Sequence, residues 1–466
     1  MVLLLIGCGA VGHAILETLP LCKLVSVKIY KQVVVIEPRD LQSNVVKRFP
    51  GEILHIKTEL TPTTMNRIVN ETIDKYKPVA CIDVSVNVDA LAVLRCCSAK
   101  SVLYINTSME IWEVENAHKL NKNPREIEKR TLYHHLLEAR REFSKSNITS
   151  VVIDNGMNPG LITQFAKCGL YNAGDSITKR LVREGKCGEA AEREGLRVVH
   201  VSERDTQKTR AKNLDVSKTF YNTWSVLGFV AESLDPVQIG HGTHEKNIPK
   251  KIVPTTGPRN MAFLPVRGMD MKLKSYVPGP VVNVTKGGLR SGGNIVGYAI
   301  PHGEANTISL EFSHGNYRPS VYYVYQCSEI AAKSLEWMRK NNYHMQASWR
   351  VLSLPELSSG YDAVGALLCF ADGRTIWSGT VLSVPMAKKL GYKFSGPTTI
   401  QVAISIIATL KWILKNNREG FMTPEQLPWQ TILKWCRPFL GKIICKRVPA
   451  KFGTSDLTLA SFIYKK

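Results

Sequence analysis

The first twelve residues constrain the fold more than any other part of the sequence. They read MVLLLIGCGAVG, an apolar run of strand length that ends in the pattern Gly-x-Gly-x-x-Gly, and HAILETLP continues with helical periodicity. A glycine turn between a buried strand and a helix is how Rossmann folds bind the pyrophosphate of a dinucleotide. Gly7 permits the tight turn, Gly9 lets the backbone approach the pyrophosphate, and Gly12 permits close packing of helix on strand. The helix N-terminus offers free N–H groups to the phosphates.

The second apolar run, QVVVIEPRD, ends at Glu37 and predicts which dinucleotide binds. A carboxylate at this position accepts hydrogen bonds from the ribose hydroxyls of adenosine and repels a 2′-phosphate, so NAD is favoured over NADP. Arg39 is the nearby feature that could admit NADP. FAD is a further alternative, because the same motif serves it.

The alternation of strands and helices predicts an α/β fold and the division of the chain. The runs PVACIDVSVN, SVLYINTSM and SVVIDNGMNPG, with a charged helical stretch before the last of them, predict a doubly wound parallel sheet, and hence a Rossmann domain, in residues 1–155. In residues 156–395 strand-like runs outnumber helices and Gly/Pro turns are frequent, which indicates a second α+β domain with a mixed, largely antiparallel sheet for substrate and dimer contacts. Residues 396–466 are expected to be a C-terminal helical segment that packs back on the Rossmann domain.

Composition narrows the choice of partners. The formal net charge is +22, but the Lys and Arg residues are scattered without a long basic run, so we expect no nucleic-acid partner. The eleven cysteines form no CxxC motif, which favours reduced thiols in the cytoplasm, and His244–Glu245 lacks a second ligand four residues away, so no metal is expected. The N-terminus lacks the basic region of a leader, and Lys411 interrupts the most apolar later run. We expect a soluble protein without a membrane partner.

Several acids of the predicted second domain follow apolar runs or glycine turns. They are Glu203 in SERDTQ, Glu232 after VLGFVA, Glu304 beside His302 in PHGEAN, and Asp362 before AVGALLCF. Each alone is most simply a solvated turn residue or a satisfied polar group, and Trp224, eight positions before Glu232, is most simply a core residue. Together, carboxylates and an aromatic face along an apolar channel would suit a cationic substrate.

The chain as a whole resembles the homospermidine synthases of the NAD-dependent bacterial and viral type, within the saccharopine dehydrogenase-like enzymes. The likeness is carried, in order from Gly7 to about Leu440, by GCGAVG, DNGMNPGLITQFAK, SERDTQ, NTWSVLGFVAE, IGHGTHEK, PHGEAN, RPSVYYVYQ, SGYDAVGALL and GYKFSGPTTIQVA. The resemblance implies that two putrescines, or spermidine and putrescine, are joined to sym-homospermidine with loss of ammonia or diaminopropane. It implies imine and Schiff-base intermediates, with NAD returning the hydride it takes, and a homodimer.

The resemblance also implies the site residues. The implied catalytic residues are Trp224, Glu203, Glu232, His302 and Asn158, and the implied substrate-binding residues are Glu110, Glu203, Trp224, Glu232, His302, Glu304 and Asp362. The expected cofactor-binding residues are Gly7, Gly9, Ala10, Val11, Gly12, Glu37, Thr107 and Asn158. The proton acceptor for the reacting amine could be a desolvated carboxylate or His302.

Two positions depart from the family pattern. His241 stands where relatives often have tryptophan, and Asn87 stands where some have an acid, which bears on substrate preference. The alternative function is a saccharopine- or carboxynorspermidine-type dehydrogenase with net redox change. The substrates of such an enzyme carry carboxylates, so its pocket should be lined by arginines rather than acids. A non-enzymatic nucleotide-sensing or nucleic-acid-binding protein would instead need a clustered basic face.

Overall fold

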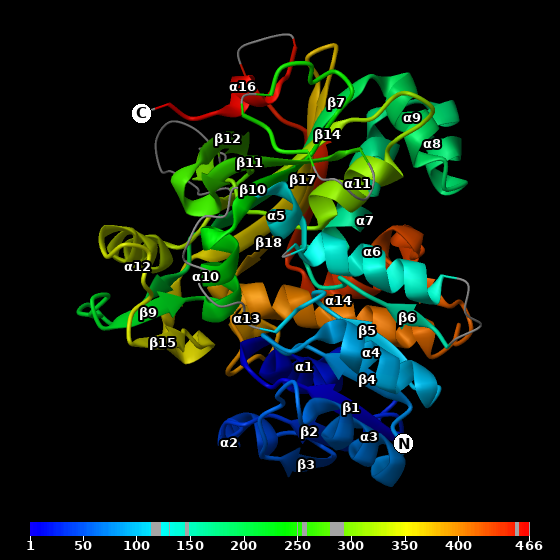
Figure 1. Cartoon of the computed structure of the whole chain (residues 1–466), viewed down its shortest axis with the longest axis vertical. Helices are drawn as coiled ribbons and strands as arrows, with labels where there is room; N and C mark the ends of the chain where they lie inside the picture. The colour runs from blue at the N-terminus through cyan, green and yellow to red at the C-terminus, as the bar shows by residue number, and fades with distance from the viewer. Residues whose placement is uncertain are drawn as a thin grey trace.

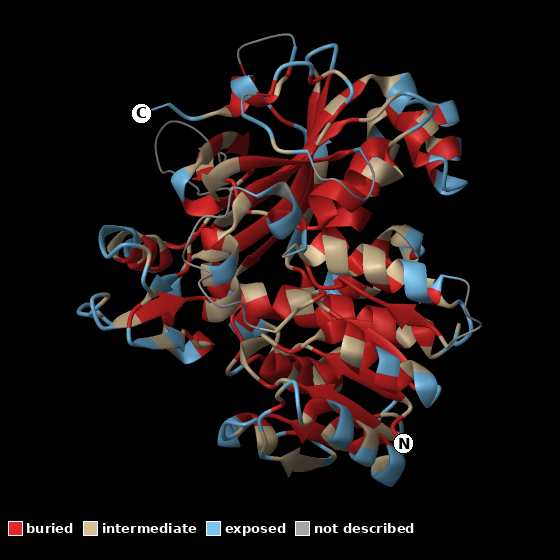
Figure 2. Cartoon of the chain, viewed as in Figure 1, coloured by how far each residue is buried: buried red, intermediate tan, exposed pale blue. Residues whose placement is uncertain are grey.

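The computed structural model describes residues 1–112, 123–129, 131–144, 149–248, 250–253, 259–279, 293–452 and 456–465. Two β-sheets dominate this part of the chain, the first in the lower half of the view and the second in the upper half (Figure 1). The inner strands of both sheets are deeply buried, and exposed residues gather on the outer helices and loops (Figure 2).

The first sheet has, in the described residues, seven parallel strands in the order β19-β6-β5-β4-β1-β2-β3. The strands are β1 (Val2–Ile6), β2 (Gln32–Ile36), β3 (Glu52–Ile56), β4 (Ala80–Asp83), β5 (Leu103–Asn106), β6 (Val151–Val152) and β19 (Phe421–Met422). Leu3 and Leu5 of β1 face one hydrophobic core, and Leu4 and Ile6 face another. A strand buried on both faces is typical of a sheet covered by helices on both sides, so the predicted doubly wound sheet is confirmed.

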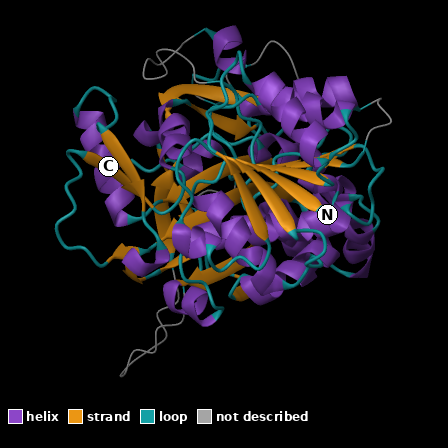
Figure 3. Cartoon of the chain, turned by 90° about the horizontal axis from the view of Figure 1, so that it is seen from below, coloured by secondary structure: helices purple, strands orange, loops and turns teal. Residues whose placement is uncertain are grey.

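Helices flank the first sheet, as the view from below shows (Figure 3). On one face α1 (Ala10–Cys22) packs against α14 (Pro397–Ile413), and on the other lie α3 (Met65–Tyr76), α4 (Ala90–Ala99) and α6 (Leu132–Phe143). The strand order reverses between β1 and β4, and open α/β sheets bind ligands at the carboxyl ends of strands at such a point. No helix among the described residues is both long and apolar enough to cross a lipid bilayer.

The second sheet is mixed and largely antiparallel, as predicted. Its main path runs β11-β10-β14-β7-β17-β18-β20, with β13 pairing β14 and β12 pairing β13. The strands are β7 (Leu196–Asp205), β10 (Pro236–Gly240), β11 (Met261–Arg267), β12 (Lys272–Tyr276), β13 (Asn294–Tyr298), β14 (Ser320–Gln326), β17 (Tyr361–Phe370), β18 (Thr375–Ser383) and β20 (Lys442–Arg447). Its centre is formed by β7, which pairs in parallel with β14 and antiparallel with β17.

Smaller elements complete the architecture. Two two-stranded sheets pair β9 (Thr219–Asn222) with β15 (Ser348–Val351) and β8 (Lys208–Thr209) with β16 (Leu357–Ser359). The remaining α-helices are α2 (Ser43–Val46), α5 (Pro124–Lys129), α7 (Leu161–Ala173), α8 (Ser176–Arg183), α9 (Cys187–Glu194), α10 (Val226–Leu234), α11 (Glu304–Glu311), α12 (Glu329–Lys340), α13 (Val384–Lys389), α15 (Trp429–Cys436) and α16 (Leu459–Phe462). Short 3-10 helices are η1 (Gly268–Asp270), η2 (Leu354–Glu356), η3 (Pro424–Gln426) and η4 (Arg437–Phe439).

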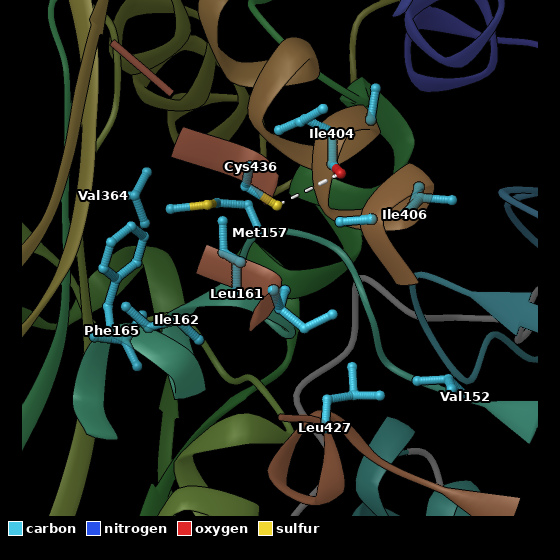
Figure 4. Packing of buried hydrophobic residues seen from close by; sticks show 14 of the residues in the cluster. Val152, Met157, Leu161, Ile162, Phe165, Val364, Ile404, Ile406, Leu427 and Cys436 are labelled. Carbon is cyan, nitrogen blue, oxygen red and sulfur yellow. Dashed lines mark hydrogen bonds between the residues drawn. The ribbon is translucent and has the colours of Figure 1, made fainter. Parts of the chain in front are cut away.

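The C-terminal segment is shared between the two sheets. After α14 the chain adds β19 to the first sheet, next to β6, and β20 to the second, next to β18. Figure 4 shows Ile404 and Cys436 of this segment in one cluster with Met157, Leu161 and Phe165, and Cys436 Sγ donates to the Ile404 carbonyl at 3.6 Å. The segment is therefore not purely helical. The division at residues 155 and 395 stays a prediction.

Candidate active site

The glycine turn opens onto a large cavity between the two halves of the molecule. Its volume is about 610 Å³. The first half contributes Gly7, Gly9, Ala10, Val11 and Glu37, together with Val84–Val88 and Trp112, while the second half contributes Ser225, Val226, Leu227, Trp349 and Val351. The cavity lies at the reversal point of the first sheet, where a dinucleotide binds in this fold.

The turn itself has the backbone geometry of a phosphate-binding loop. Gly7 has a φ of +80°, which L side chains rarely adopt, and a Cβ there would lie 2.7 Å from the Ser85 backbone. Gly9 immediately precedes α1 and offers no side-chain cap, so the first N–H groups of the helix lack a side-chain acceptor, and Gly12 lies in the first turn. These features fit a pyrophosphate seated on the helix N-terminus.

Glu37 connects the end of β2 to the glycine turn. Its Oε2 accepts the Cys8 backbone N–H at 2.7 Å, and its Oε1 accepts Arg39 Nε at 2.7 Å. Burial raises the pKa of Glu37, but the Arg39 hydrogen bond and charge and the Cys8 N–H outweigh it, so the pKa lies below the usual value. Arg39 also lies over the Trp349 ring, 5.1 Å from its centroid. The carboxylate is thus ionised at the position expected to face the ribose.

Gly9→Ala should weaken dinucleotide binding without harming the fold. Gly9 has a φ of −72°, and a Cβ there would meet Arg39 Nη2 at 3.5 Å, an ordinary contact. The same Cβ would stand where the pyrophosphate approaches the backbone. We expect the NAD Kd to rise at least about tenfold, or about 1.4 kcal/mol, with an unchanged melting temperature. Fluorescence titration and thermal denaturation measure the two quantities, and an unaltered Kd would contradict this position for the pyrophosphate.

The start of α10 places Trp224 and Glu232. Ser225 caps the helix, because its Oγ accepts the Gly228 N–H at 3.2 Å, so Trp224 stands just before the first turn. Glu232 lies two turns further and lines a second cavity of about 80 Å³ with Glu110 and His302. Val86 and Asn87 line both cavities. The two cavities are therefore neighbours, with α10 contributing to each.

His302 lies between two carboxylates. Its Nε2 is 3.1 Å from Glu232 Oε1, and its Nδ1 is 3.0 Å from Glu304 Oε1. Both Glu232 Oε2 and Glu304 Oε2 are buried without a hydrogen-bond partner among the described residues. Two carboxylates that share one imidazole keep capacity to bind a further cation.

A second group of acids lies on the central strands of the upper sheet. Glu203 Oε2 accepts Asn158 Nδ2 at 2.8 Å and the hydroxyl of Tyr323. Asp205, two residues further along β7, faces Asp362 in register on β17, and Gln401 Nε2 donates to Asp362 Oδ2 at 3.1 Å. Glu203 and Asp205 thus lie within the strand rather than in a turn after it.

Trp224 joins this group through an aromatic contact. Its Nε1 donates to the Tyr325 hydroxyl at 3.0 Å, and its ring lies 5.7 Å from that of Phe229. The side chain is half-buried rather than enclosed. A tryptophan fixed by one hydrogen bond and by ring contacts with Phe229 and Tyr325, and not wholly covered, can present a π-face to a cation.

Two family models match the chain. The saccharopine dehydrogenase NADP binding domain matches residues 3–151, and the saccharopine dehydrogenase C-terminal domain matches residues 156–445, more than half of the sequence. The chain belongs to the saccharopine dehydrogenase family.

Two curated relatives of the chain are homospermidine synthases. The protein of Mesorhizobium japonicum is 28% identical over 460 residues, covering 94% of this chain and 88% of that protein. The protein of Blastochloris viridis is 27% identical over 376 residues, with coverage of 78% and 74%. The resemblance noted from the sequence motifs is confirmed.

Solved structures confirm the fold of this saccharopine dehydrogenase family member. The homospermidine synthase of Legionella pneumophila, in complex with NAD, has a TM-score of 0.82 and 24% identity, covering 100% of this chain and 99% of that one. A saccharopine dehydrogenase of Saccharomyces cerevisiae has a TM-score of 0.50 and 12% identity, covering 96% and 99%.

Burial raises the pKa values of several acids in the site toward neutral pH. Desolvation raises the pKa of Glu110 and of Glu203 to about 7 each, and that of Asp205 to about 6. Burial alone would lower the pKa of His302, but the charges of Glu304 and Glu232 outweigh it and raise that pKa well above the usual value. At neutral pH the site therefore combines a protonated imidazole with acids close to their titration midpoints.

The predicted residues fall into these places to differing extents. Glu110, Glu232 and His302 line the small cavity. Glu304 lies next to it, hydrogen-bonded to His302. Glu203 is linked to His302 through Tyr323, whose hydroxyl bonds Glu203 and whose ring contacts the imidazole. Asp362 is fully buried and lines neither cavity, and Thr107 follows β5 near Gly156. Asn158, which was expected to contact the cofactor, makes hydrogen bonds to Glu203 and Tyr323. The roles of all these residues stay predictions.

The sequence did not single out Tyr323, Tyr325 or Asp154. Both tyrosines lie on β14 and point to the acids, and the period-two pattern in RPSVYYVYQ was the signal for their shared face. Asp154 is buried, its Oδ1 accepts the Met109 N–H at 2.9 Å, and burial with the charge of Glu304 raises its pKa to about 8. His241, which differs from the family pattern, forms a hydrogen bond between its ring Nε2 and the Glu245 carbonyl at 2.9 Å.

Proposed function

We propose that this chain is a homospermidine synthase, which joins two putrescines, or spermidine and putrescine, by NAD-dependent aminobutyl transfer. The observation that carries the proposal is His302 paired with Glu232 and Glu304, where Glu110, Glu232 and His302 line a cavity adjoining the dinucleotide cavity. In a chain of net charge +22, these buried acids supply the attraction that a diamine needs. The two homospermidine synthase relatives support the same reaction.

The small cavity disfavours substrates that carry carboxylates. Its described lining residues include three acids, Glu110, Glu232 and Asp235, against the single imidazolium of His302, and no Lys or Arg. A saccharopine-type dehydrogenase binds amino-acid-derived substrates and needs cationic groups to pair their carboxylates. The lining therefore favours an amine substrate over the net-redox alternative.

NAD is the dinucleotide that these residues fit. The Gly7–Gly12 turn would hold its pyrophosphate, and the ionised Glu37 would accept its ribose hydroxyls and repel a 2′-phosphate. When bound, NAD accepts a hydride from the amine-bearing carbon and later returns it. Arg39 is engaged with Glu37 and Trp349, which weakens the case for NADP.

The chain's own residues handle protons and charge. A primary ammonium must lose a proton before its carbon can give up a hydride. Glu110 and Glu203, each with a pKa of about 7, are suited to accept it, whereas His302 is already protonated at neutral pH. Of the two acids, Glu203 is the one that Tyr323 connects to His302, through its hydroxyl and its ring. We therefore propose Glu203 as the proton acceptor, with the pairs that His302 makes to Glu232 and Glu304 setting the charge that faces the substrate.

An assay with putrescine and a catalytic amount of NAD⁺ tests the function. Homospermidine and ammonia should accumulate while the NADH concentration stays below that of the enzyme-bound cofactor. Chromatography of the amines and absorbance of NADH read the two results. Stoichiometric NADH without homospermidine would replace this proposal with the dehydrogenase alternative.

Diamine binding should strengthen as pH rises through 7. Glu110 and Glu203 have usual values of 4.5 that burial raises to about 7, so they are protonated below and ionised above that pH. The folded protein holds these protons more tightly than the unfolded chain. The free energy of unfolding therefore falls as Glu110 and Glu203 ionise, between pH 4.5 and pH 7. A bound diamine offsets this cost. We expect putrescine with NAD⁺ to raise the melting temperature more at about pH 8 than at about pH 6, and the reverse order would contradict these ionisations.

Compartment and assembly complete the proposal. We infer a cytoplasmic homodimer. All eleven cysteines are free, which agrees with a reducing compartment. Light scattering after size-exclusion chromatography measures the assembly state directly, and a monomer at micromolar concentration would contradict the dimer.

A further inference from the structure

Tyr323 lies where the two groups of ionisable residues meet. Its hydroxyl donates to Glu203 Oε2 and accepts Asn158 Nδ2 at 2.8 Å, and the same amide donates to Glu203 Oε2 at 2.8 Å. Three polar side chains therefore form a closed triangle. The hydroxyl is fully committed within it, since it makes one donated and one accepted hydrogen bond.

The ring of Tyr323 makes a second, separate contact. Its centroid is 4.4 Å from that of His302, and it stacks on Tyr325 at 6.0 Å with an interplanar angle of 15°. Tyr325 in turn accepts the indole N–H of Trp224. One side chain thus touches the proposed proton acceptor through its hydroxyl and the imidazolium through its ring.

We propose that Tyr323 is a positioning residue that fixes Glu203 through its hydroxyl and His302 through its ring, so that acid and imidazolium face the same substrate. This role deepens the function proposed above and rests on it for the identity of the substrate. The two contacts can be separated, because the hydroxyl and the ring can be removed one at a time.

The hydroxyl has a defined electrostatic effect. A hydrogen bond donated to a carboxylate favours its ionised form, so Tyr323 lowers the pKa of Glu203 against the burial that raises it. The groups that act on Glu203 from the neighbouring elements are His302 before α11, Asp362 on β17, Asp205 on its own strand, Tyr325 on β14 and Cys327 after β14. Glu232 on α10 acts on the Tyr323 hydroxyl. Removing the Tyr323 hydroxyl alone leaves these side chains intact, but it also takes an acceptor from the Asn158 amide, which donates to Glu203.

The adjacent residue Tyr322 provides a matched control. It is equally buried, but strand alternation points it to the opposite face of β14, where its hydroxyl donates to Glu245. Tyr322→Phe and Tyr323→Phe each remove a buried hydrogen bond from a tyrosine to a glutamate, and Tyr323→Phe also removes the bond that its hydroxyl accepts from Asn158. Only the bonds of Tyr323 belong to the site.

The first experiment is the pH dependence of kcat/KM for putrescine. In Tyr323→Phe the acid limb should move up by about one pH unit or more, while Tyr322→Phe keeps the wild-type limb even if it melts earlier. A fluorinated tyrosine at position 323, a stronger donor of the same shape, should move the limb down. Equal shifts in both Phe variants, or no shift in Tyr323→Phe, would overturn the proposal.

A second readout does not depend on turnover. Carbon-13 NMR of labelled glutamate carboxyls should show the Glu203 titration moving up in Tyr323→Phe and down with the fluorinated residue. Nitrogen-15 NMR should show the His302 titration unchanged in Tyr323→Phe but lowered in Tyr323→Leu, which removes the ring from the imidazolium. If no homospermidine is formed, the proposed function fails, and these titrations still decide the positioning role.

Discussion

Glu232→Gln should lower kcat/KM for putrescine about 100-fold while the NAD Kd stays at its wild-type value. Truncating one partner of a buried, hydrogen-bonded charge pair between two molecules costs about 2–5 kcal/mol of binding free energy, and about 1.4 kcal/mol corresponds to a tenfold change. Glu232 lies 3.1 Å from His302, and its Oε2 is buried with no hydrogen-bond partner in the described part of the chain. The amide would therefore remove the negative charge that faces both the imidazolium and the diamine.

The measurement needs a control for buried glutamates in general. Glu245 is also buried and its pKa is also raised, but its carboxylate is bound to Ser320 and to the Leu459 N–H. Glu245→Gln should lower the melting temperature and leave kcat/KM close to wild type. Equal loss of NAD binding and diamine use in Glu232→Gln would show that the residue supports the fold and not the substrate.

Trp224→Ala should lower kcat/KM about 30-fold, whereas Trp224→Phe should retain most of it. A desolvated cation–π contact is worth about 2 kcal/mol, which corresponds to about 30-fold, and phenylalanine keeps a π-face while losing the bond from the indole N–H to Tyr325. Steady-state kinetics with putrescine measure the loss for each variant.

The competing interpretation is that Trp224 is a core residue. Its contact with Phe229 gives some support to that reading, and a large aromatic in a core costs about 3–5 kcal/mol when cut to alanine. Trp412, a half-buried tryptophan of α14 packed on the same core cluster, is the comparison. Trp412→Ala should lose stability without a change in kcat/KM. If Trp224→Ala instead failed to fold, the aromatic would belong to the core.

The Rossmann half could be predicted because its signals are local. Apolar strands, a glycine turn and the acid at the end of β2 follow each other within forty residues, and each has a physical reason. β19 gave no such signal, because two residues cannot show a period. Its place beside β6 depends on contacts made by residues some 270 positions apart in the sequence.

The sequence supplied candidate site residues, whose roles stay predictions, but not their geometry. Glu203, Glu232 and His302 come from a strand, a helix and a loop, and no periodicity connects them. The resemblance to homospermidine synthases grouped them, but not the hydrogen bonds among them. Tyr323 was not identified because a tyrosine in a buried strand is an ordinary core residue until its hydroxyl is placed against Glu203.

The return of the C-terminal segment to the first sheet has a consequence for synthesis. α14 and β19 emerge from the ribosome only after nearly the whole second sheet. Yet β19 forms an edge strand of the nucleotide-binding sheet, and α14 covers one face of it. We therefore expect the face of α1 that packs on α14 to stay uncovered during synthesis until the last part of the chain has been made. Nucleotide binding and the amine pocket should consequently be acquired together, at the end of translation.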